Sequence, residues 1–473
     1  MENQSQPSRA GLVLAVLSAA AFMASLDLFI VNVAFDDIRH DFSGASLSDL
    51  SWVLNAYAIT YAALLVPLGR LADRYGRKGG FLLGVAVFTA ASAACALSPG
   101  LWWLVGLRAL QAAGAAALTP TSLGLLLAAT PAERRVRAVR IWAASGGLAA
   151  AAGPVVGGLL VSASWRWVFL VNIPVGILAL VVAARIVPAS RDLTSTRLPD
   201  AAGAVLLTAA VGGMALGLVK SPDWGWTSGG TTASFAVAAA GLAIFWWRSH
   251  RHHTPIVDPA LMKVPAFAWS NVTAIAFSAA FAGGLLAAVL WLQEVWGYSP
   301  LRTGLAIAPG PVMVPLFAAL TQRFGSRVAP GRVAAVGCVL FGTAYLVVVL
   351  SIGAEPSYLL HFLPAWLLGG IGVGLALPTI MSAATADLPP DRTATGSAII
   401  NMSRQIGAVL GISVLIAVLG SPHGYTATHT VFVHAWLVIA AVSLLAGVSA
   451  LGMTPRRVAT EVAPAVPELA AAS

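Results

Sequence analysis

The sequence predicts an all-α integral membrane protein with 14 transmembrane helices. Of its 473 residues, 58% are hydrophobic and only 10% are charged, whereas a soluble domain carries roughly 25% charged residues. Apolar runs of the length that crosses about 30 Å of hydrocarbon recur along the whole chain. This composition excludes a secreted or cytosolic enzyme and a nucleic-acid-binding protein, although the net charge is +9.

Fourteen apolar runs reach the length of a membrane span. Backbone groups in lipid must hydrogen-bond within the chain, and the alternating ten-residue pattern of a membrane β-barrel is absent, so each run is predicted to be a helix. The predicted spans are 12–34, 50–68, 79–97, 101–127, 139–162, 167–187, 200–219, 231–247, 268–293, 303–320, 333–352, 358–384, 397–418 and 431–452.

The basic residues predict the orientation. With the N-terminus inside, 21 of the 27 basic residues fall in cytoplasmic segments, four fall outside, and Arg108 and Arg404 lie within spans. The positive-inside rule therefore places both termini in the cytoplasm. Three lysines against 24 arginines, with abundant alanine and glycine, suggest a GC-rich bacterium and hence its inner (plasma) membrane.

A weak internal repeat indicates two similar halves. The loop 69–78 follows the second span and 320–327 follows the tenth, and five positions match when Gly76 is aligned with Gly325. The predicted organisation is a six-helix bundle (12–187), two inserted linker helices (200–247), a second six-helix bundle (268–452) and a cytoplasmic tail (453–473). Repeated halves around a midplane cavity are the architecture of alternating-access transporters.

The loop 69–78 places one acid, Asp73, among four basic residues. The positive-inside bias explains the basic residues but neither the carboxylate nor the two glycines. We interpret the loop as a conformational gate in which the acid changes partners, and the alternative is a structural anchor. The gate residues are Gly69, Asp73, Arg74, Gly76 and Arg77.

The fifth span is rich in small residues around a proline. Small residues let helices approach closely, and proline removes a backbone hydrogen bond and favours a kink. From the residues alone, a packing groove without further role is an open alternative to a transport motif. The residues concerned are Gly146, Gly153, Pro154, Gly157 and Gly158.

These segments resemble known motifs of one family. The loop 69–78 closely resembles the motif between spans 2 and 3 of the major facilitator superfamily, whose aspartate helps to lock the outward-facing state; the second copy has Gln322 in place of that aspartate. The pattern of 153–158 resembles the antiporter motif of drug exporters, which implies export. Four further segments resemble those of fourteen-span drug:proton antiporters of the EmrB/QacA type: 26–34, 164–176, 293–304 and 396–411. The likeness as a whole covers about residues 12 to 455.

Asp27 and Arg108 are the predicted proton-coupling residues. Each lies about seven residues, or roughly 10 Å, from the outer end of its span, and the resemblance makes the two spans neighbours. Desolvation favours protonation of a carboxylate whereas a nearby cation favours its ionisation, and a balance of the two suits proton coupling. A static salt bridge is the alternative. Residues 104–114 resemble the family's proton-transfer motif, with Ala112 in place of its usual glycine, and Gln111 is expected to hydrogen-bond near the arginine.

Other polar and aromatic side chains are candidates for the substrate cavity. Glu294 is equally compatible with a solvated rim, Arg404 with a side chain that reaches the cytoplasm, and the remainder with packing between helices. The candidates are Asn32, Asn55, Tyr57, Tyr61, Gln111, Trp142, Glu294 and Arg404.

The predicted function is secondary active efflux of drugs or antibiotics by proton antiport. The chain has no Gly-x-x-x-x-Gly-Lys-Ser/Thr phosphate-binding loop, and we expect no enzymatic activity, cofactor or metal. The expected partners are hydrophobic or cationic small molecules, protons and the lipid bilayer, and the expected state is a monomer. The alternatives are a dedicated exporter of one endogenous metabolite, an uptake symporter of the same fold, and a membrane-embedded enzyme or channel.

Overall fold

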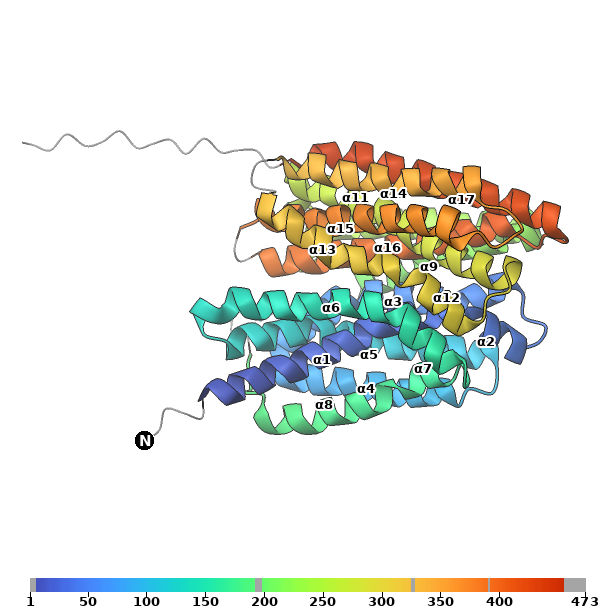
Figure 1. Ribbon diagram of the computed structural model, residues 1–473. Helices are drawn as coiled ribbons and strands as arrows, with labels where there is room; N and C mark the ends of the chain where they lie inside the picture. Colours follow the sequence, from blue (N-terminus) through green and yellow to red (C-terminus); the bar gives the residue numbers. More distant parts are fainter. Residues whose placement is uncertain (1–5, 192–197, 325–327, 390–391, 455–473) are drawn as a thin grey trace, which may run out of the picture.

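The computed structural model describes residues 6–191, 198–324, 328–389 and 392–454. These residues form helices and connecting turns, and no strand occurs among them. Within these ranges, fourteen helices are long and apolar enough to cross a membrane, which confirms the predicted all-helical fold with 14 spans. The first and last described helices, α1 (Gln6–Val33) and α17 (Tyr425–Ala450), have their outer termini at the same end of the molecule (Figure 1).

The first bundle is the lower, blue-to-green half of Figure 1. Its spans pack mainly as the pairs α4 with α5, α3 with α5, and α1 with α6. The elements are α1, α2 (Phe35–Asp41), α3 (Leu47–Tyr75), α4 (Arg77–Ala96), α5 (Leu101–Ala129), α6 (Ala132–Val161), α7 (Trp167–Leu170) and α8 (Asn172–Ile186).

The second bundle is the upper, yellow-to-red half of Figure 1. It includes two one-turn π-helices, η2 (Trp291–Val295) and η4 (Tyr358–Phe362), each at the end of a longer helix. The other elements are α11 (Pro265–Leu290), α12 (Pro300–Ile307), α13 (Pro309–Phe324), α14 (Pro330–Ser351), α15 (Leu363–Ala386), α16 (Thr393–Leu419) and α17, with short 3-10 turns at Leu261–Lys263 and Leu451–Met453.

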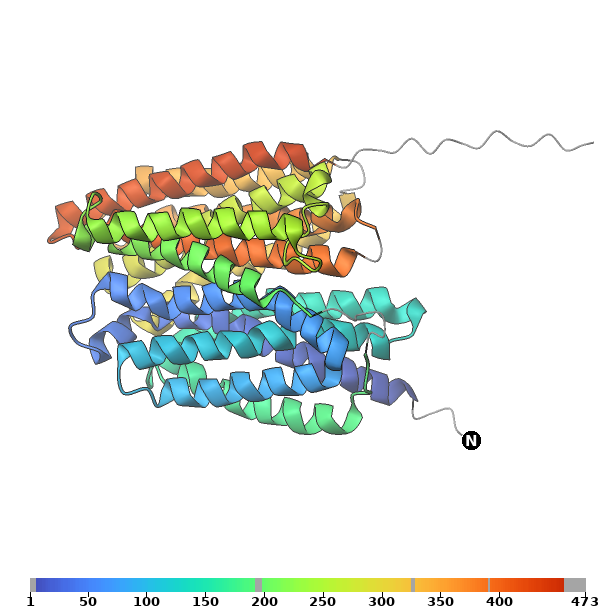
Figure 2. The ribbon, with the colours of Figure 1, turned by 180° about the vertical axis from the view of Figure 1, so that it is seen from behind.

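Two further helices lie beside the bundles. Helix α9 (Ala201–Trp224) contacts both α3 and α16, one from each bundle, and α10 (Gly229–Arg251) packs along α9 (Figure 2). Ion pairs hold both ends of α9. Lys220 Nζ lies 2.6 Å from Asp49 Oδ1 of α3, and Arg248 Nε lies 2.8 Å from Asp200 Oδ1 at its start.

Glycines let equivalent helix pairs cross closely in both bundles. In the first, a Cβ added to Gly114 of α5 would lie 2.5 Å from the backbone nitrogen of Phe88 in α4. In the second, a Cβ added to Gly337 of α14 would lie 2.7 Å from the backbone nitrogen of Ala376 in α15. Small residues permit such backbone contact between membrane helices. The first crossing joins spans 3 and 4, and the second joins spans 11 and 12. These pairs occupy the same positions in the two predicted halves, which supports the predicted internal repeat.

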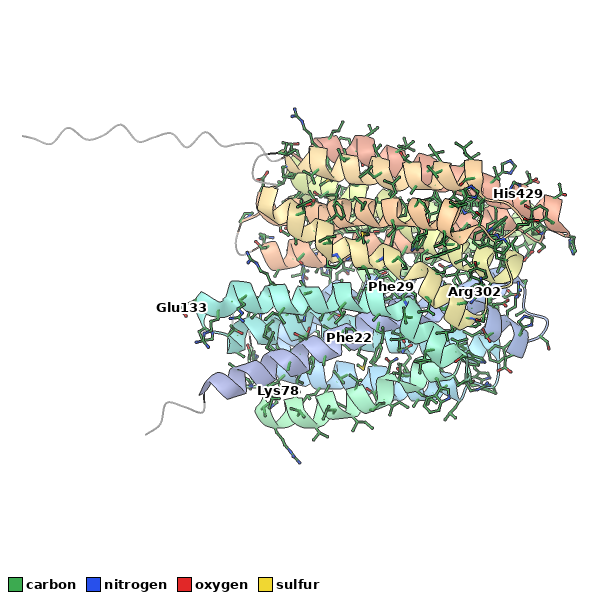
Figure 3. All side chains as sticks on the ribbon, viewed as in Figure 1. Phe22, Phe29, Lys78, Glu133, Arg302 and His429 are labelled. Carbon is green, nitrogen blue, oxygen red and sulfur yellow. The ribbon has the colours of Figure 1, made fainter. Side chains whose placement is uncertain are left out.

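A cavity of about 1090 Å³ lies between the bundles. Its walls come from α1, α3, α5 and α6 on one side and from α11, α13, α14, α15 and α16 on the other. It extends to Arg77, Arg135 and Thr393, which lie at helix ends on the side of the chain termini. We call this side the basic end; Glu133 and Lys78 mark it in Figure 3, and Arg302 and His429 mark the opposite end.

The bundles meet at the opposite end of the molecule. Asn55 Nδ2 of α3 donates to Ser413 Oγ of α16 at 3.3 Å, and Gln293 Nε2 of η2 donates to the Val33 carbonyl oxygen of α1 at 3.1 Å. Arg39 Nη1 of α2 lies 2.8 Å from Glu294 Oε1 of η2. The cavity is therefore open toward the basic end and closed by contacts between the bundles at the other.

Candidate functional site

The two predicted coupling residues meet inside the first bundle. Asp27 of α1 is fully buried and Arg108 of α5 is 1% exposed. Arg108 Nη1 donates to Asp27 Oδ2, and Arg108 Nε donates to the Val53 carbonyl oxygen at 3.2 Å. Two opposite charges removed from water in this way need further hydrogen bonds to be tolerated, and the neighbouring side chains supply them.

Gln111 joins both members of this ion pair. Its Oε1 accepts from Arg108 Nη1 at 2.6 Å, and its Nε2 donates to Asp27 Oδ1 at 2.9 Å. The same Nε2 also donates to Ser92 Oγ of α4 at 2.8 Å. Gln111 is therefore part of the charged cluster and does not line the cavity.

Two members of the cluster were not identified from the sequence. Asn172 of α8 donates its Nδ2 to Asp27 Oδ1 at 3.1 Å, and Ser92 of α4 accepts from Gln111. Asn172 lies in the segment 164–176, so the family resemblance could have identified it. Ser92 is one small polar residue in an apolar helix, and no sequence pattern distinguishes it.

Two stacked tyrosines connect Arg108 of this cluster with the cavity wall. The Arg108 guanidinium carbon lies 4.1 Å from the ring centre of Tyr57, a cation–π contact. The Tyr57 ring stacks on that of Tyr61, with centres 6.2 Å apart and planes 10° apart. Tyr61 lines the cavity whereas Asp27 and Tyr57 do not. Asp27 is thus not part of the cavity wall, and the two tyrosines connect its partner Arg108 with that wall.

The predicted gate loop lies at the mouth of the cavity. Gly69, Asp73 and Arg77 line the mouth, and Arg77 Nε donates to Asp73 Oδ1 at 2.6 Å. Gly76 forms the turn between α3 and α4 at a φ of +129°, a conformation that favours glycine. In this conformation the gate acid is paired within its own loop, beside Arg74. Residues 325–327 of the second copy lie outside the described residues.

Glycines of the fifth span form close contacts with both bundles. A Cβ added to Gly153 would lie 2.6 Å from Phe29 Cβ of α1, and one on Gly157 would lie 3.0 Å from the Ile30 carbonyl oxygen. A Cβ on Gly158 would lie 2.4 Å from the Pro300 carbonyl oxygen of α12. Pro154 contributes its carbonyl oxygen to the same contact with α12, and Gly146 lines the cavity beside Ser25.

The remaining cavity candidates divide into two groups. Tyr61, Trp142 and Arg404 line the cavity, and Trp142 Nε1 donates to Ser122 Oγ at 3.1 Å. Asn32 and Asn55 lie elsewhere, with Asn32 Nδ2 donating to the Leu28 carbonyl oxygen at 3.0 Å. Burial alone does not distinguish the groups, because a polar residue in a span faces either a cavity or another helix.

Glu294 and Tyr57 also lie outside the cavity wall, as does Gln111. Glu294 is at the opposite end, where it pairs with Arg39. Within the described part of the chain, no group of three or more histidine, cysteine, aspartate or glutamate side chains is arranged to hold a metal ion.

A family model for the Major Facilitator Superfamily matches residues 17–412 and again residues 273–470. The chain belongs to the Major Facilitator Superfamily. It is a transporter rather than an enzyme. Its spans and its bacterial relatives together make it a multi-pass protein of a bacterial plasma membrane.

Relatives within the superfamily cover nearly the whole chain. The Methylenomycin A resistance protein of Streptomyces coelicolor is 31% identical over 94% of this chain and 93% of its own length. The Multidrug resistance protein Stp of Mycobacterium tuberculosis is 36% identical over 87% of this chain and 76% of its own length. The Tetracenomycin C resistance and export protein of Streptomyces glaucescens is 32% identical over the same shares.

Solved structures of peptide transporters share the fold. A peptide transporter POT in complex with sulfate superposes with a TM-score of 0.67 over 93% of this chain and 94% of its own. The sequences are only 19% identical, so the likeness concerns the arrangement of helices and not the substrate.

Proposed function

We propose that this chain exports hydrophobic small molecules, including drugs or antibiotics, in exchange for protons and by alternating access. The observation that carries the proposal is a fully buried carboxylate–guanidinium pair beside a large, mainly apolar cavity that is open at one end. Relatives named for resistance to methylenomycin A, for multidrug resistance and for tetracenomycin C export support the substrate class and the direction.

The orientation follows from the basic residues. The positive-inside rule places the basic end in the cytoplasm, so the cavity in this structure faces the cytoplasm. A substrate enters there from the cytoplasm or the inner leaflet and is held by apolar and aromatic walls, which suit broad recognition. The chain acts in this proposal as a monomer.

Protonation of Asp27 is the proposed coupling event. When Asp27 carries a proton, its attraction to Arg108 is lost, and the helices that the cluster joins (α1, α4, α5 and α8) are free to adjust. Protonation from outside would favour the inward-facing state and release of substrate, and loss of the proton to the cytoplasm would restore substrate binding. Because Asp27 is not part of the cavity wall, substrate and proton influence one another through the helices.

Everted vesicles test the coupling. In energised vesicles containing the wild type, we expect lipophilic cations, neutral antibiotics or lipophilic acids to dissipate the proton gradient when they are transported. Asp27→Asn should reduce this substrate-dependent proton release at least tenfold. Asp387→Asn is the matched control, because this acid is exposed at the end of α15 and lies outside the cavity wall. An unchanged response of Asp27→Asn would contradict the proposal and move coupling to Glu294 or elsewhere.

A further inference from the structure

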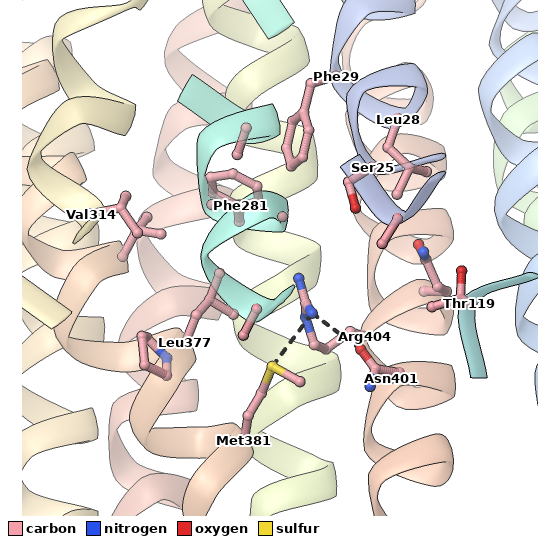
Figure 4. Close-up of a pocket in the computed structure, with 18 of the residues that line it drawn as sticks. Ser25, Leu28, Phe29, Thr119, Phe281, Val314, Leu377, Met381, Asn401 and Arg404 are labelled. Carbon is pink, nitrogen blue, oxygen red and sulfur yellow. Dashed lines mark hydrogen bonds between the residues drawn. The ribbon is translucent and has the colours of Figure 1, made fainter. Parts of the chain in front are cut away.

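Arg404 places an unneutralised positive charge on the cavity wall. Its Nη1 lies 3.3 Å from Asn401 Oδ1 and 3.5 Å from Met381 Sδ, and its buried Nε has no hydrogen-bond partner. No carboxylate among the described residues forms an ion pair with it. Figure 4 shows this side chain reaching into the space between Ser25 and Phe281. A guanidinium offers five N–H donors, and among the described residues only Nη1 of Arg404 has a hydrogen-bond partner.

The described wall of the cavity as a whole also carries a net positive charge. Four arginines line it, Arg70, Arg77, Arg135 and Arg404, whereas Asp73 is the one acidic residue of the described lining. Asp73 is already paired with Arg77 at the mouth. A buried charge without a counter-ion is costly, so a cationic ligand would add to this cost and an anionic ligand would relieve it.

The cavity wall around Arg404 is mainly apolar. Phe29 of α1 and Phe281 of α11 meet edge to face with ring centres 6.4 Å apart, and both line the cavity with Leu28, Val314 and Leu377. Such walls take up a ring-bearing apolar body. Weak screening in a nonpolar site strengthens the attraction between a guanidinium and an acidic oxygen, and the planar fork of arginine matches a carboxylate in two hydrogen bonds.

We propose that the preferred substrates are amphiphilic organic acids, with an apolar ring body against Phe29 and Phe281 and a carboxylate on Arg404. This inference rests on the proposed export function and names its substrate class. It replaces the cationic substrates expected from the sequence with anionic ones, because the described cavity wall has no free acid for a cation.

Three probes of one scaffold separate charge from hydrophobicity. They are anthracene-9-carboxylate (anion), its methyl ester (neutral) and 9-(aminomethyl)anthracene (cation at pH 7). The fluorescence of each probe reports its binding to the purified full-length protein in phosphatidylcholine nanodiscs. The signal from empty nanodiscs is subtracted. These lipids carry no net charge, so no anionic headgroup competes for Arg404.

We expect the wild type to bind the carboxylate at least tenfold more tightly than the amine. Arg404→Gln should weaken carboxylate binding at least tenfold and leave ester binding within twofold, which also shows that the variant is folded. Arg404→Lys keeps the charge but loses the planar fork, so its affinity for the carboxylate should lie between those of the wild type and Arg404→Gln. Arg134→Gln removes an exposed arginine that does not line the cavity, and it should bind all three probes as the wild type does.

Three results would overturn the inference. They are an amine that binds as tightly as the carboxylate, a carboxylate affinity that is unchanged in Arg404→Gln, and the absence of saturable binding by all three probes. Transport in proteoliposomes separates this inference from the proposed function. Carboxylate binding without uphill transport would leave the inference standing and refute export. Uphill transport with a selectivity that Arg404→Gln does not change would support export and refute the inference.

Discussion

Asp27 accepts hydrogen bonds from two helices besides its own, and a third helix holds one of the donors. Arg108 and Gln111 come from α5 and Asn172 comes from α8, while Ser92 of α4 ties Gln111 in place. A change of charge on one carboxylate therefore alters contacts in four helices at once. This distribution distinguishes the cluster from a salt bridge that pins only two helices, which was the alternative interpretation of the sequence.

Gln111 is the residue whose loss should affect coupling most after the ion pair itself. Gln111→Leu removes one hydrogen bond to each charged partner, and such bonds contribute roughly 1.5–3 kcal/mol each. Because about 1.4 kcal/mol corresponds to a tenfold change, we expect substrate-dependent proton release to fall at least tenfold. Ser92→Ala removes one neutral partner of Gln111 and should have a smaller effect. A wild-type rate in Gln111→Leu would show that the amide is not part of the coupling machinery.

At the scale of helices, α6 and α12 form a further contact between the bundles at the opposite end. A Cβ added to Gly304 of α12 would lie 2.1 Å from the Pro154 carbonyl oxygen of α6, and one on Gly158 would lie 2.4 Å from the Pro300 carbonyl oxygen. The two helices come from different bundles, so their glycines bring the bundles together on this side. The antiporter-like segment thus combines packing against α1 with closure against α12.

Gly304→Ala should separate α6 from α12 and open the closed end. A methyl group cannot fit 2.1 Å from an oxygen atom, so the backbones must move apart. In a Ser413→Cys background, we expect at least fivefold faster labelling by a membrane-impermeant thiol reagent from the opposite side, because Ser413 is buried where α16 meets α3.

Gly147→Ala is the matched control for this experiment. Gly147 lies on α6, and nothing lies within 4 Å of a Cβ added there. We expect its labelling rate to equal that of the Ser413→Cys background alone. Equal labelling of Gly304→Ala would mean that the contact between α6 and α12 does not control access from this end.

At the scale of the whole molecule, the structure represents one state of an alternating cycle. The bundles are apart at the basic end and joined at the other by the pairs Asn55–Ser413 and Arg39–Glu294. Helix α9 contacts α3 and α16, which also form the closing contact. We propose that α9 and α10 are a pair inserted between two six-helix bundles and that α9 guides the movement of α3 against α16.

The distance between Glu133 and Ala386 should report the position of the basic end. Both residues are exposed there, on α6 and α15 of different bundles, so spin labels at these sites follow the opening by double electron–electron resonance. We expect the wild type to show both a short and a long distance, because the proposed cycle passes through both states. Asp27→Asn mimics the protonated carboxyl group, which favours the inward-facing state in the proposed cycle, and should show the long distance alone. A short-distance population in Asp27→Asn equal to that of the wild type would separate Asp27 from the conformational change.

The membrane fold could be predicted from the sequence, because a span must be apolar over its full length and this requirement is visible residue by residue. The sequence predicted 14 spans, all of which occur, but it placed several helix ends too early. Helix α3 continues to Tyr75 although the apolar run ends near residue 68, because a helix continues into the polar interface where apolar character no longer marks it. The sequence also identified Asp27 and Arg108, because a charge within an apolar run is conspicuous.

Tertiary structure alone decided which polar side chains meet. Asn55, Tyr57 and Gln111 are indistinguishable from Tyr61 and Trp142 as isolated polar or aromatic residues within spans, yet only the latter two line the cavity. The direction in which a side chain points depends on the rotation of its helix against its neighbours, and small residues such as Gly158 and Gly304 set that rotation through contacts with distant segments. The unneutralised charge of Arg404 was likewise invisible in the sequence, because it depends on which acids the fold brings within reach, and Asp73, the one acid of the described cavity wall, is already paired with Arg77.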